Sequence, residues 1–364
     1  EGKRAVVDQD LGPLIATEMT RCIHCTRCVR FGDEIAGMRE MGATGRGENT
    51  QIGTYVQHAM KSEVSGNIID LCPVGALTSR PYRFTARAWE MSQFKGISPH
   101  DCLGSHLSIH VRRQEVMRVV PREQESLNEV WLSDRDRFGY LGLTHALRSK
   151  FPRIKRAGRW EVVDWKTALQ HAIALLQKCL SQHGASQVAA FASSSSSLEE
   201  LYLLQRWMRA IGVTNLDHRL QQTDFRDQCH LPLMPTSSML YEELDHKNTI
   251  LLCGTHLNRE VPLAALRVRK AFLSGAKIAA INPIRYPLPF DLSEQWITTL
   301  HQMVYSMGKI LLALVAKRDE LPEEVQQWLQ EINPDAASKR LAEAFKLGNA
   351  AIVTGAIAEN HPEA

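Results

Sequence analysis

The chain has 364 residues, of which 44% are hydrophobic and 23% are charged, and its formal net charge is +3. A chain of this length and composition can bury a sizeable core, and we expect two or three domains. The near balance of charge argues against a nucleic-acid-binding protein, which would need a strong basic field.

Neither a membrane span nor a targeting segment is predicted. The longest apolar run near the end of the chain, 310–316, is too short to cross a bilayer and lies between Lys309 and Lys317. Any link to a membrane is therefore expected to go through partners. The chain begins at Glu1 without a methionine and without a targeting pattern, so we expect it to be a fragment of a longer polypeptide.

The first predicted element is a metal site. Cysteines recur with two residues between them at Cys22, Cys25 and Cys28, and Cys72 follows after 43 intervening residues in a Cys-Pro pair. A tight loop that offers three thiolates, together with a fourth thiolate from elsewhere in the fold, is the ligand pattern of one [4Fe–4S] cluster. We expect Pro73 to end the ligand loop and to begin a helix.

The ligand set of a second cluster is absent. Two-cluster ferredoxins exchange their fourth ligands between two such cysteine runs. Here Gly32 stands where Cys28 would be followed by its own Cys-Pro, and Ser62, Ser65 and Ile68 stand where the other triplet would precede Cys72. The frame is ferredoxin-like with one complete site.

Structural zinc and a disulfide framework are the alternatives for these cysteines. Structural zinc usually takes paired Cys or His ligands, and three cysteines in close succession with a distant Cys-Pro do not follow that pattern. Disulfides are not expected in a long chain with 8 scattered cysteines and no secretory segment. The iron–sulfur interpretation is favoured, in a reducing compartment.

Three domains are predicted. A [4Fe–4S] cluster domain covers 1–95, a small β-rich domain covers 96–150, and an α/β domain, expected to be truncated, covers 151–364. Alternating apolar residues over 107–111 and 115–120 indicate short antiparallel strands. Basic residues crowd the boundary near 150, where a linker or a solvated face is favoured over a binding patch: Arg148, Lys150, Arg153, Lys155, Arg156 and Arg159.

The third domain alternates helical patterns with short apolar runs. This order predicts a parallel sheet with crossover helices. The serine run 193–197 lies between a strand and a helix, and Ser196 with Glu199 fits the spacing of a capping box. A phosphate cradle is the alternative for this loop. The predicted helices are 165–182, 198–211 and 263–273, and the predicted strands are 188–192, 249–253 and 276–281.

Several stretches together resemble one family, the large iron–sulfur subunit of respiratory complex I, which is the 75-kDa subunit in mitochondria. The resemblance covers almost the whole chain. It implies that the four cysteines hold the all-cysteine [4Fe–4S] cluster in the middle of the subunit's chain of clusters, which passes electrons from the NADH side toward the quinone side. The most specific stretches are 10–13, 19–30, 34–37, 45–47, 65–79 and 84–87.

The resemblance also implies partners and a location. The expected partners are other peripheral-arm subunits of complex I, namely the NADH-binding flavoprotein subunit and the two-cluster ferredoxin-like subunit toward the quinone site. The expected location is the cytoplasmic side of the bacterial inner membrane or, alternatively, the matrix side of the mitochondrial one. A [2Fe–2S] cluster and a further [4Fe–4S] cluster with one histidine ligand are expected in a missing N-terminal part.

The α/β part resembles molybdopterin oxidoreductases, but no molybdopterin is expected. Active members place a metal-ligating residue after a stretch similar to 215–217, and the nearest equivalent here is Thr223. Some members carry an extra cluster at the front of this fold. Its ligand positions correspond to Pro99, Cys102, His106 and Ser133, so that cluster is expected to be lost.

The other cysteines are best interpreted as packing residues, although a ligand role stays open for each. They are Cys102, Cys179, Cys229 and Cys253.

Charged residues surround the ligand loop. His24 is interpreted as an exposed loop histidine, with a proton-coupled influence on the potential as the alternative. Three arginines, at positions 21, 27 and 30, either favour the reduced cluster or pair with a partner. We assign no catalytic residue, because the run His100-Asp101-Cys102 has no context of a cysteine nucleophile.

The favoured hypothesis is an electron-transfer subunit of NADH:quinone oxidoreductase with no active site of its own in this chain. The first alternative is a molybdenum enzyme of the formate dehydrogenase type. The second is a structural module whose cluster only holds the fold together.

Overall fold

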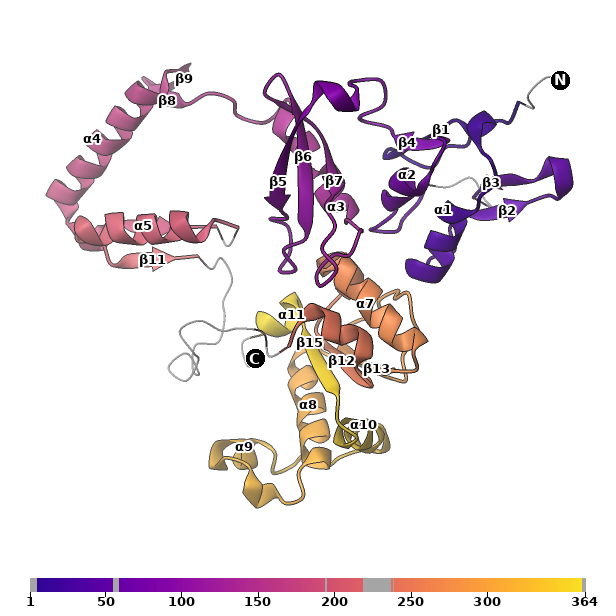
Figure 1. The fold of residues 1–364 in the computed structure, drawn as a ribbon. Helices are drawn as coiled ribbons and strands as arrows, with labels where there is room; N and C mark the ends of the chain where they lie inside the picture. Colours follow the sequence, from indigo (N-terminus) through magenta and orange to yellow (C-terminus); the bar gives the residue numbers. More distant parts are fainter. Residues whose placement is uncertain (1–4, 55–58, 194, 219–236, 238, 362–364) are drawn as a thin grey trace. The chain divides into compact units, whose positions relative to one another are not determined.

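The computed structural model describes residues 5–54, 59–193, 195–218, 237 and 239–361. The chain divides into two compact units (Figure 1). One unit consists of residues 1–140 together with 223–364, and the other consists of residues 141–222. Within the described ranges, no helix has the length and apolar character that crossing a bilayer requires. The domain boundaries that we predict near 95 and 150 stay predictions.

Short elements enclose the predicted cluster region. Strand β1 (Ile15–Thr17) pairs antiparallel with β4 (Leu77–Ser79), and β2 (Gly42–Thr44) pairs antiparallel with β3 (Gln51–Gly53). Helix α1 (Arg27–Arg30) continues directly into a short π-helix, η2 (Phe31–Ile35). Helix α2 (Asn67–Leu71) ends just before the fourth cysteine. A single turn of 3-10 helix, η1 (Met19–Arg21), leads into the first cysteine.

Our prediction that Pro73 begins a helix is wrong. The helix lies on the other side of the cysteine, because α2 ends at Leu71 and the next regular element after Cys72 is β4. Cys72 has an extended backbone, with φ −77° and ψ 107°. The ring of a proline disfavours helical geometry in the residue before it, so Pro73 ends the preceding helix instead of starting a new one.

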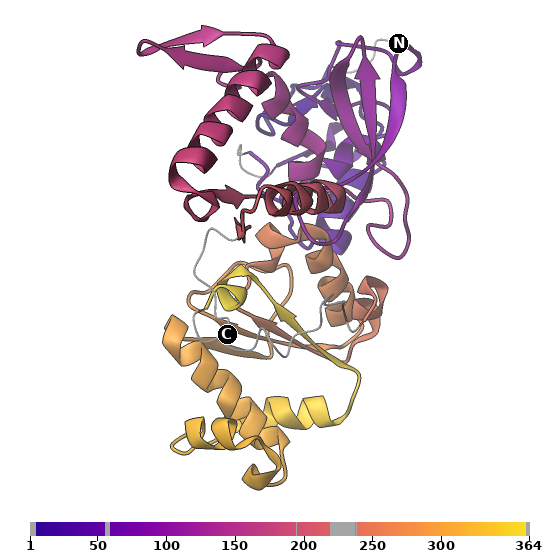
Figure 2. The same cartoon turned by 90° about the vertical axis from the view of Figure 1, so that its left-hand side faces the viewer.

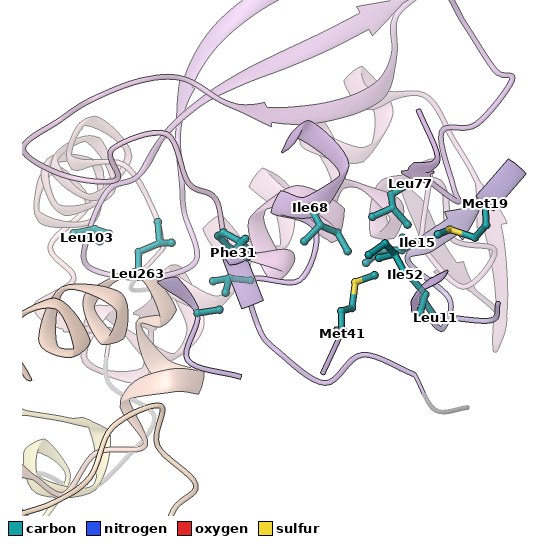
Figure 3. Packing of buried hydrophobic residues seen from close by; sticks show 12 residues of the cluster. Leu11, Ile15, Met19, Phe31, Met41, Ile52, Ile68, Leu77, Leu103 and Leu263 are labelled. Carbon is teal, nitrogen blue, oxygen red and sulfur yellow. The ribbon is translucent and has the colours of Figure 1, made fainter. Parts of the chain in front are cut away.

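One apolar core holds these elements together. The side chains of Ile15, Ile52, Ile68 and Leu77 come from β1, β3, α2 and β4, and they gather in one cluster (Figure 3). The same core reaches Leu103 and also Leu263 of the α/β region. The cluster region therefore shares its core with later parts of the same unit.

The β-rich region is a three-stranded antiparallel sheet of order β5-β6-β7, as the alternation predicts. Its strands are β5 (Ser92–Ile97), β6 (His106–Arg112) and β7 (Glu115–Pro121). Leu107, Val119 and Leu132 form its buried centre. Helix α3 (Asp134–Phe138) follows, and Ser133 caps it by accepting the amide hydrogen of Asp136.

A four-stranded parallel sheet of order β14-β13-β12-β15 forms the α/β part of the same unit, as predicted. Its strands are β12 (Thr249–Cys253), β13 (Lys277–Asn282), β14 (Glu294–Ile297) and β15 (Ala350–Thr354). Helices cover both faces: α7 (Pro262–Leu273) on one, and α8 (Leu300–Leu314) with α10 (Ala336–Lys346) on the other.

Side chains that alternate along β12 explain this two-sided burial. Ile250 and Leu252 pack with α7, whereas Leu251 and Cys253 pack with α8 and α10. A strand that is covered on both faces needs apolar residues at successive positions. Figure 2 shows α8 in orange beside the yellow α10, which pack against each other. Short helices in this part include α6 (Leu257–Glu260), α9 (Glu323–Trp328) and α11 (Ala356–Glu359).

The second unit begins with an antiparallel hairpin. The later part of the predicted basic run, from Arg153 onward, lies in its strands, β8 (Arg153–Arg156) and β9 (Arg159–Val162), whose side chains are mostly exposed. Helix α4 (Trp165–His183) follows, and then β10 (Ala189–Phe191), α5 (Leu198–Ala210) and β11 (Asn215–Asp217) form a parallel strand–helix–strand unit. Such exposure fits both a solvated face and a binding patch, so the choice between them stays a prediction.

The predicted capping box is displaced by one residue. Ser197, not Ser196, caps α5, and its partner is Glu200, not Glu199. The Ser197 hydroxyl accepts the Glu200 amide hydrogen at 3.3 Å, and the Glu200 carboxylate accepts the Ser197 amide hydrogen at 2.9 Å. Both pairs have the same spacing in the sequence, so only the residue at which the backbone turns helical decides between them.

Candidate metal centre

The four predicted ligands meet at one small pocket. Cys22, Cys25, Cys28 and Cys72 all line it, and its remaining wall includes the apolar side chains of residues 19, 52, 76 and 77. Three elements bring the thiols together: η1 leads into the first, α1 carries the third, and α2 delivers the fourth. The spacing in the sequence indicates a common site, and the fold places the thiols at one.

Left-handed turns curl the ligand loop around the pocket. His24 has φ 53° and Thr26 has φ 60°. Few residues other than glycine adopt this backbone region, so their occurrence at alternate positions marks a constrained loop. The amide hydrogen of His24 points to the Cys22 sulfur at an N···S distance of 3.4 Å. Such bonds to sulfur are one means by which a protein adjusts the potential of an iron–sulfur cluster.

Burial dominates the electrostatics of the Cys28 thiol. Burial raises the pKa of this thiol to about 11, with smaller contributions from the charges of the other three cysteines, against a hydrogen bond with the Val29 backbone that lowers it. Metal coordination favours the thiolate form, because ligation and deprotonation are coupled. Four cysteine thiols around one pocket are the donor set of a [4Fe–4S] cluster, so the residues present fit that group.

Structural zinc stays the alternative for these four thiols. Four thiolates on one zinc ion would each lie about 2.3 Å from it. Among the residues that the structure describes, no group of three or more His, Cys, Asp or Glu side chains is placed to hold a metal ion. Metal content therefore has to decide between zinc and iron.

Arginines near the loop form ion pairs with carboxylates. Arg21 pairs with Glu18 at 2.8 Å, and Arg30 pairs with Glu34 at 3.0 Å. Arg83 also reaches Glu18, at 2.7 Å. These carboxylates offset the positive field that we predict around the thiolates, so a strong effect of Arg21 and Arg30 on the potential is not expected.

The loop itself faces outward. Ile23, His24 and Cys25 are all exposed. The exposed position of His24 agrees with its interpretation as a loop histidine. A redox group bound here would lie near the surface of the unit.

The positions predicted for a lost extra cluster have separate hydrogen-bond partners. Cys102 contacts the Tyr241 hydroxyl at 3.2 Å, and His106 contacts Arg122 at 2.9 Å. Ser133 caps α3 and donates to Asp136 at 2.9 Å.

The structure describes two of the other three cysteines. Cys253 is 1% exposed in β12, and burial raises its pKa to about 11. Its sulfur contacts that of Met307 at 3.5 Å, which agrees with a packing role. Cys179 lies within α4, and Cys229 and the molybdenum-ligand equivalent Thr223 fall outside the described residues.

Sequence analysis missed one group of residues, which forms hydrogen bonds around the start of α2. The carboxylate of Asp134 accepts the hydroxyl hydrogen of Ser65 at 2.5 Å and the amide hydrogen of Gly66 at 2.6 Å. Burial raises the pKa of Asp134 to about 6, against the Ser65 and Gly66 hydrogen bonds that lower it. Only the resemblance marks 65–67 as special, and 68 residues separate Gly66 from its acceptor, so no local pattern indicates the contact.

Family models define the class of this chain. The model described as "NADH-quinone oxidoreductase subunit 3, ferredoxin-like domain" matches residues 12–78, and "NADH-ubiquinone oxidoreductase NDSU1/NuoG-like, 4Fe-4S domain" matches residues 92–140. "Molybdopterin oxidoreductase" matches residues 148–364, which is more than half of the chain. The chain belongs to the molybdopterin oxidoreductase family, and the two shorter matches precede that part.

Curated relatives narrow this class. The "NADH-ubiquinone oxidoreductase 75 kDa subunit" of Reclinomonas americana is 38% identical over 292 residues, which are 76% of this chain and 41% of that protein. The G subunit of the NADH-quinone oxidoreductase of Rickettsia bellii (strain RML369-C) is 39% identical over 78% of this chain and 40% of its own. The mitochondrial "NADH dehydrogenase [ubiquinone] iron-sulfur protein 1" of Solanum tuberosum is 40% identical over 78% of this chain and 38% of its own.

The resemblance to the large iron–sulfur subunit of complex I is therefore confirmed, and the chain spans about two fifths of the length of these relatives. Among solved structures, "Acetylene Hydratase from Pelobacter acetylenicus" matches 72% of this chain and 40% of its own, with a TM-score of 0.52. At 16% identity this likeness shows the fold alone.

Proposed function

We propose that this chain relays single electrons as part of an NADH:quinone oxidoreductase, with Cys22, Cys25, Cys28 and Cys72 as the ligands of one [4Fe–4S] cluster. The observation that carries the proposal is the meeting of these four thiols at one pocket. The names of the curated relatives support the setting. A [4Fe–4S] cluster supplies one-electron redox chemistry when it is bound.

The residues of the chain contribute binding and environment. The 22–28 loop offers three thiolates, and the residue that ends α2 supplies the fourth. Apolar side chains such as Ile52 and Leu77 restrict the access of water. The His24 amide hydrogen helps to disperse charge on the Cys22 sulfur.

The partners in this proposal are an NADH-binding flavoprotein subunit on the donor side and a two-cluster ferredoxin-like subunit on the acceptor side. The chain would then be peripheral, on the cytoplasmic face of a bacterial inner membrane or the matrix face of a mitochondrial one. The parallel α/β part serves as scaffold, without molybdopterin and without an active site. The relatives' names favour this function over a formate dehydrogenase-type enzyme.

The test is metal content on anaerobically purified protein, with an electron paramagnetic resonance spectrum after reduction. We expect about four irons per chain, no molybdenum, and the signal of one reduced [4Fe–4S] cluster. The Cys72→Ser variant should lose most of that signal. The matched control is Cys102→Ser, which changes an exposed cysteine outside the pocket and should leave the signal intact.

Other outcomes would contradict specific parts of the proposal. Zinc in place of iron would remove the redox role, and roughly eight irons would mean that Cys102 and its neighbours hold a second cluster. Molybdenum would favour the enzyme alternative. A cluster that cannot be reduced between the potentials of a pyridine nucleotide and a quinone would indicate a purely structural role.

A further inference from the structure

The helix that delivers the fourth thiol is too short to be stable by itself. Helix α2 has only five residues, and isolated helices shorter than about 12 residues are marginal in water. Cys72 follows it directly, and the Cys72 amide hydrogen is bonded to the Ile68 carbonyl at 3.1 Å. Whatever fixes α2 therefore also fixes the position of the Cys72 sulfur.

The N-terminal end of α2 is held by a buried carboxylate. Asp134, at the start of α3, is 8% exposed. One of its oxygens accepts the amide hydrogen of Gly66, and the other accepts the hydroxyl hydrogen of Ser65. Both acceptor atoms of Asp134 thus bind the residues that lead into α2.

The rest of α2 is held by the same short segment. The side-chain amide of Asn67 donates to the Leu132 carbonyl at 2.8 Å and accepts the Leu132 amide hydrogen at 3.0 Å. The guanidinium of Arg137 donates to Asn67 at 3.2 Å and to the Asp70 carboxylate at 2.6 Å. Residues 132–137 therefore contact α2 from its first residue to its last turn.

The close fit also explains a glycine. A Cβ atom at position 66 would lie 2.7 Å from the Cδ of Arg137 and 2.8 Å from a carboxylate oxygen of Asp134. Neither side chain can move away without losing a hydrogen bond, because Asp134 accepts from the Gly66 amide and Arg137 donates to Asp70 of α2. The run Ser65-Gly66-Asn67, which the function of the cysteines does not explain, is the complement of the 132–137 segment.

We propose that Asp134 and Arg137 are positioning residues for Cys72: through their contacts with 65–70 they fix the fourth ligand of the cluster and place a buried carboxylate in its surroundings. This inference rests on the proposed ligation by Cys72. The β-rich region thereby has a role in electron transfer although the ligand positions of its own extra cluster are replaced. Ser133, one of those positions, begins the helix that carries both residues.

The test compares two matched variants on the same helix. Asp134→Asn halves the acceptor atoms that face Ser65 and Gly66 and removes a negative charge. The control is Asp136→Asn, which changes a fully buried carboxylate whose partners are Ser98, His100 and Ser133, none of them in α2. Ser65→Ala, which removes only the hydroxyl bond, is a milder second variant in case Asp134→Asn does not fold.

Two readouts are measured on the full chain. The first is hydrogen exchange of the peptide 65–72, followed by mass spectrometry in both the iron-loaded and the chelator-treated protein. The second is the midpoint potential at pH 8, where the Asp134 carboxylate is ionised, together with the resonance line shape. We expect about tenfold faster exchange in Asp134→Asn, since a bond to a charged group is lost. We also expect a higher midpoint potential, because a negative charge no longer opposes reduction.

The outcomes separate this inference from the proposed function. Faster exchange and a raised potential in Asp134→Asn, with neither change in Asp136→Asn, support the positioning role. Faster exchange with an unchanged potential and line shape would overturn it and leave a structural contact only, as would unchanged exchange in both Asp134→Asn and Ser65→Ala. Wild-type protein that holds no iron would refute the proposed function and, with it, the positioning of a cluster ligand, whatever the exchange shows.

Discussion

Arg267 of α7 offers the most demanding test of how the parts of the first unit are joined. Its guanidinium donates to the Glu125 carbonyl at 2.7 Å, to the Leu127 carbonyl at 3.0 Å, and to the Asp245 carboxylate at 2.9 Å. The side chain is only 5% exposed. An Arg267→Met change keeps much of the volume and leaves these buried acceptors without their donor.

The expected loss in the free energy of unfolding follows from these contacts. Removing one partner of a buried ion pair destabilises a protein by about 3–5 kcal/mol. The lower end applies here, because Lys270 still pairs with Asp245 at 3.0 Å after the change. We therefore expect a loss of about 3 kcal/mol, which corresponds to a fall in Tm of roughly 6–12 °C in a unit of this size.

The assay is anaerobic thermal unfolding followed by circular dichroism, with iron content measured on the same samples. The matched control is Lys270→Met, three residues away on α7, which pairs with the same Asp245 but is 55% exposed. An exposed pair contributes at most about 1 kcal/mol, so the control should lower Tm by no more than about 4 °C. The reasoning is refuted if the Arg267 variant loses no more than the control does.

Three further predictions follow from the site and the corrected elements. Burial raises the pKa of Asp134 from 3.8 in the unfolded state to about 6 in the folded state, so the folded state binds the proton more tightly. As the pH falls from 6 to 4, the free energy of unfolding of the wild type should therefore rise by about 2 kcal/mol relative to that of Asp134→Asn, measured by urea titration at each pH. The same dependence of the unfolding free energy on pH in both proteins would contradict the buried charge. Ser197→Ala should destabilise α5 by about 1 kcal/mol while Ser196→Ala does not, as judged by hydrogen exchange of the peptide 198–206; the reverse result would restore the predicted register. Gly66→Ala should release iron faster than wild type under air, measured by loss of the cluster's visible absorption, because the new Cβ would meet Arg137 2.7 Å away; an unchanged rate would show that the segment yields without moving Cys72.

Local patterns were informative wherever the determining physics is local. The alternation of apolar residues along 107–120 predicts strands that pair as expected, and the order of strands and helices after 249 predicts the parallel sheet. A cluster ligand run is also local, because Cys22, Cys25 and Cys28 can only serve one site if a single loop carries them. That these thiols meet Cys72 at one pocket agrees with the pattern, and their ligation of iron stays a prediction.

Local patterns failed to locate the end of a helix where they allowed more than one position for it. Ser196 and Ser197 each have a glutamate three residues later, and only the residue at which the backbone turns helical selects Ser197 as the cap of α5. Pro73 by itself suggests the start of a helix, but the same proline also restricts the residue before it, and this second effect decides the structure.

The sequence by itself indicated the chemistry that we propose for this protein, through four cysteines with the spacing of cluster ligands in a ferredoxin-like frame. The periodicities that follow them specify a small antiparallel sheet and a parallel α/β part. Only the tertiary structure decided what holds the fourth thiol in place. Asp134 meets Gly66 across 68 residues and Arg267 meets Leu127 across 140. Such contacts are selected by the burial of charge and by the complementarity of whole surfaces, neither of which leaves a periodic signal along the chain.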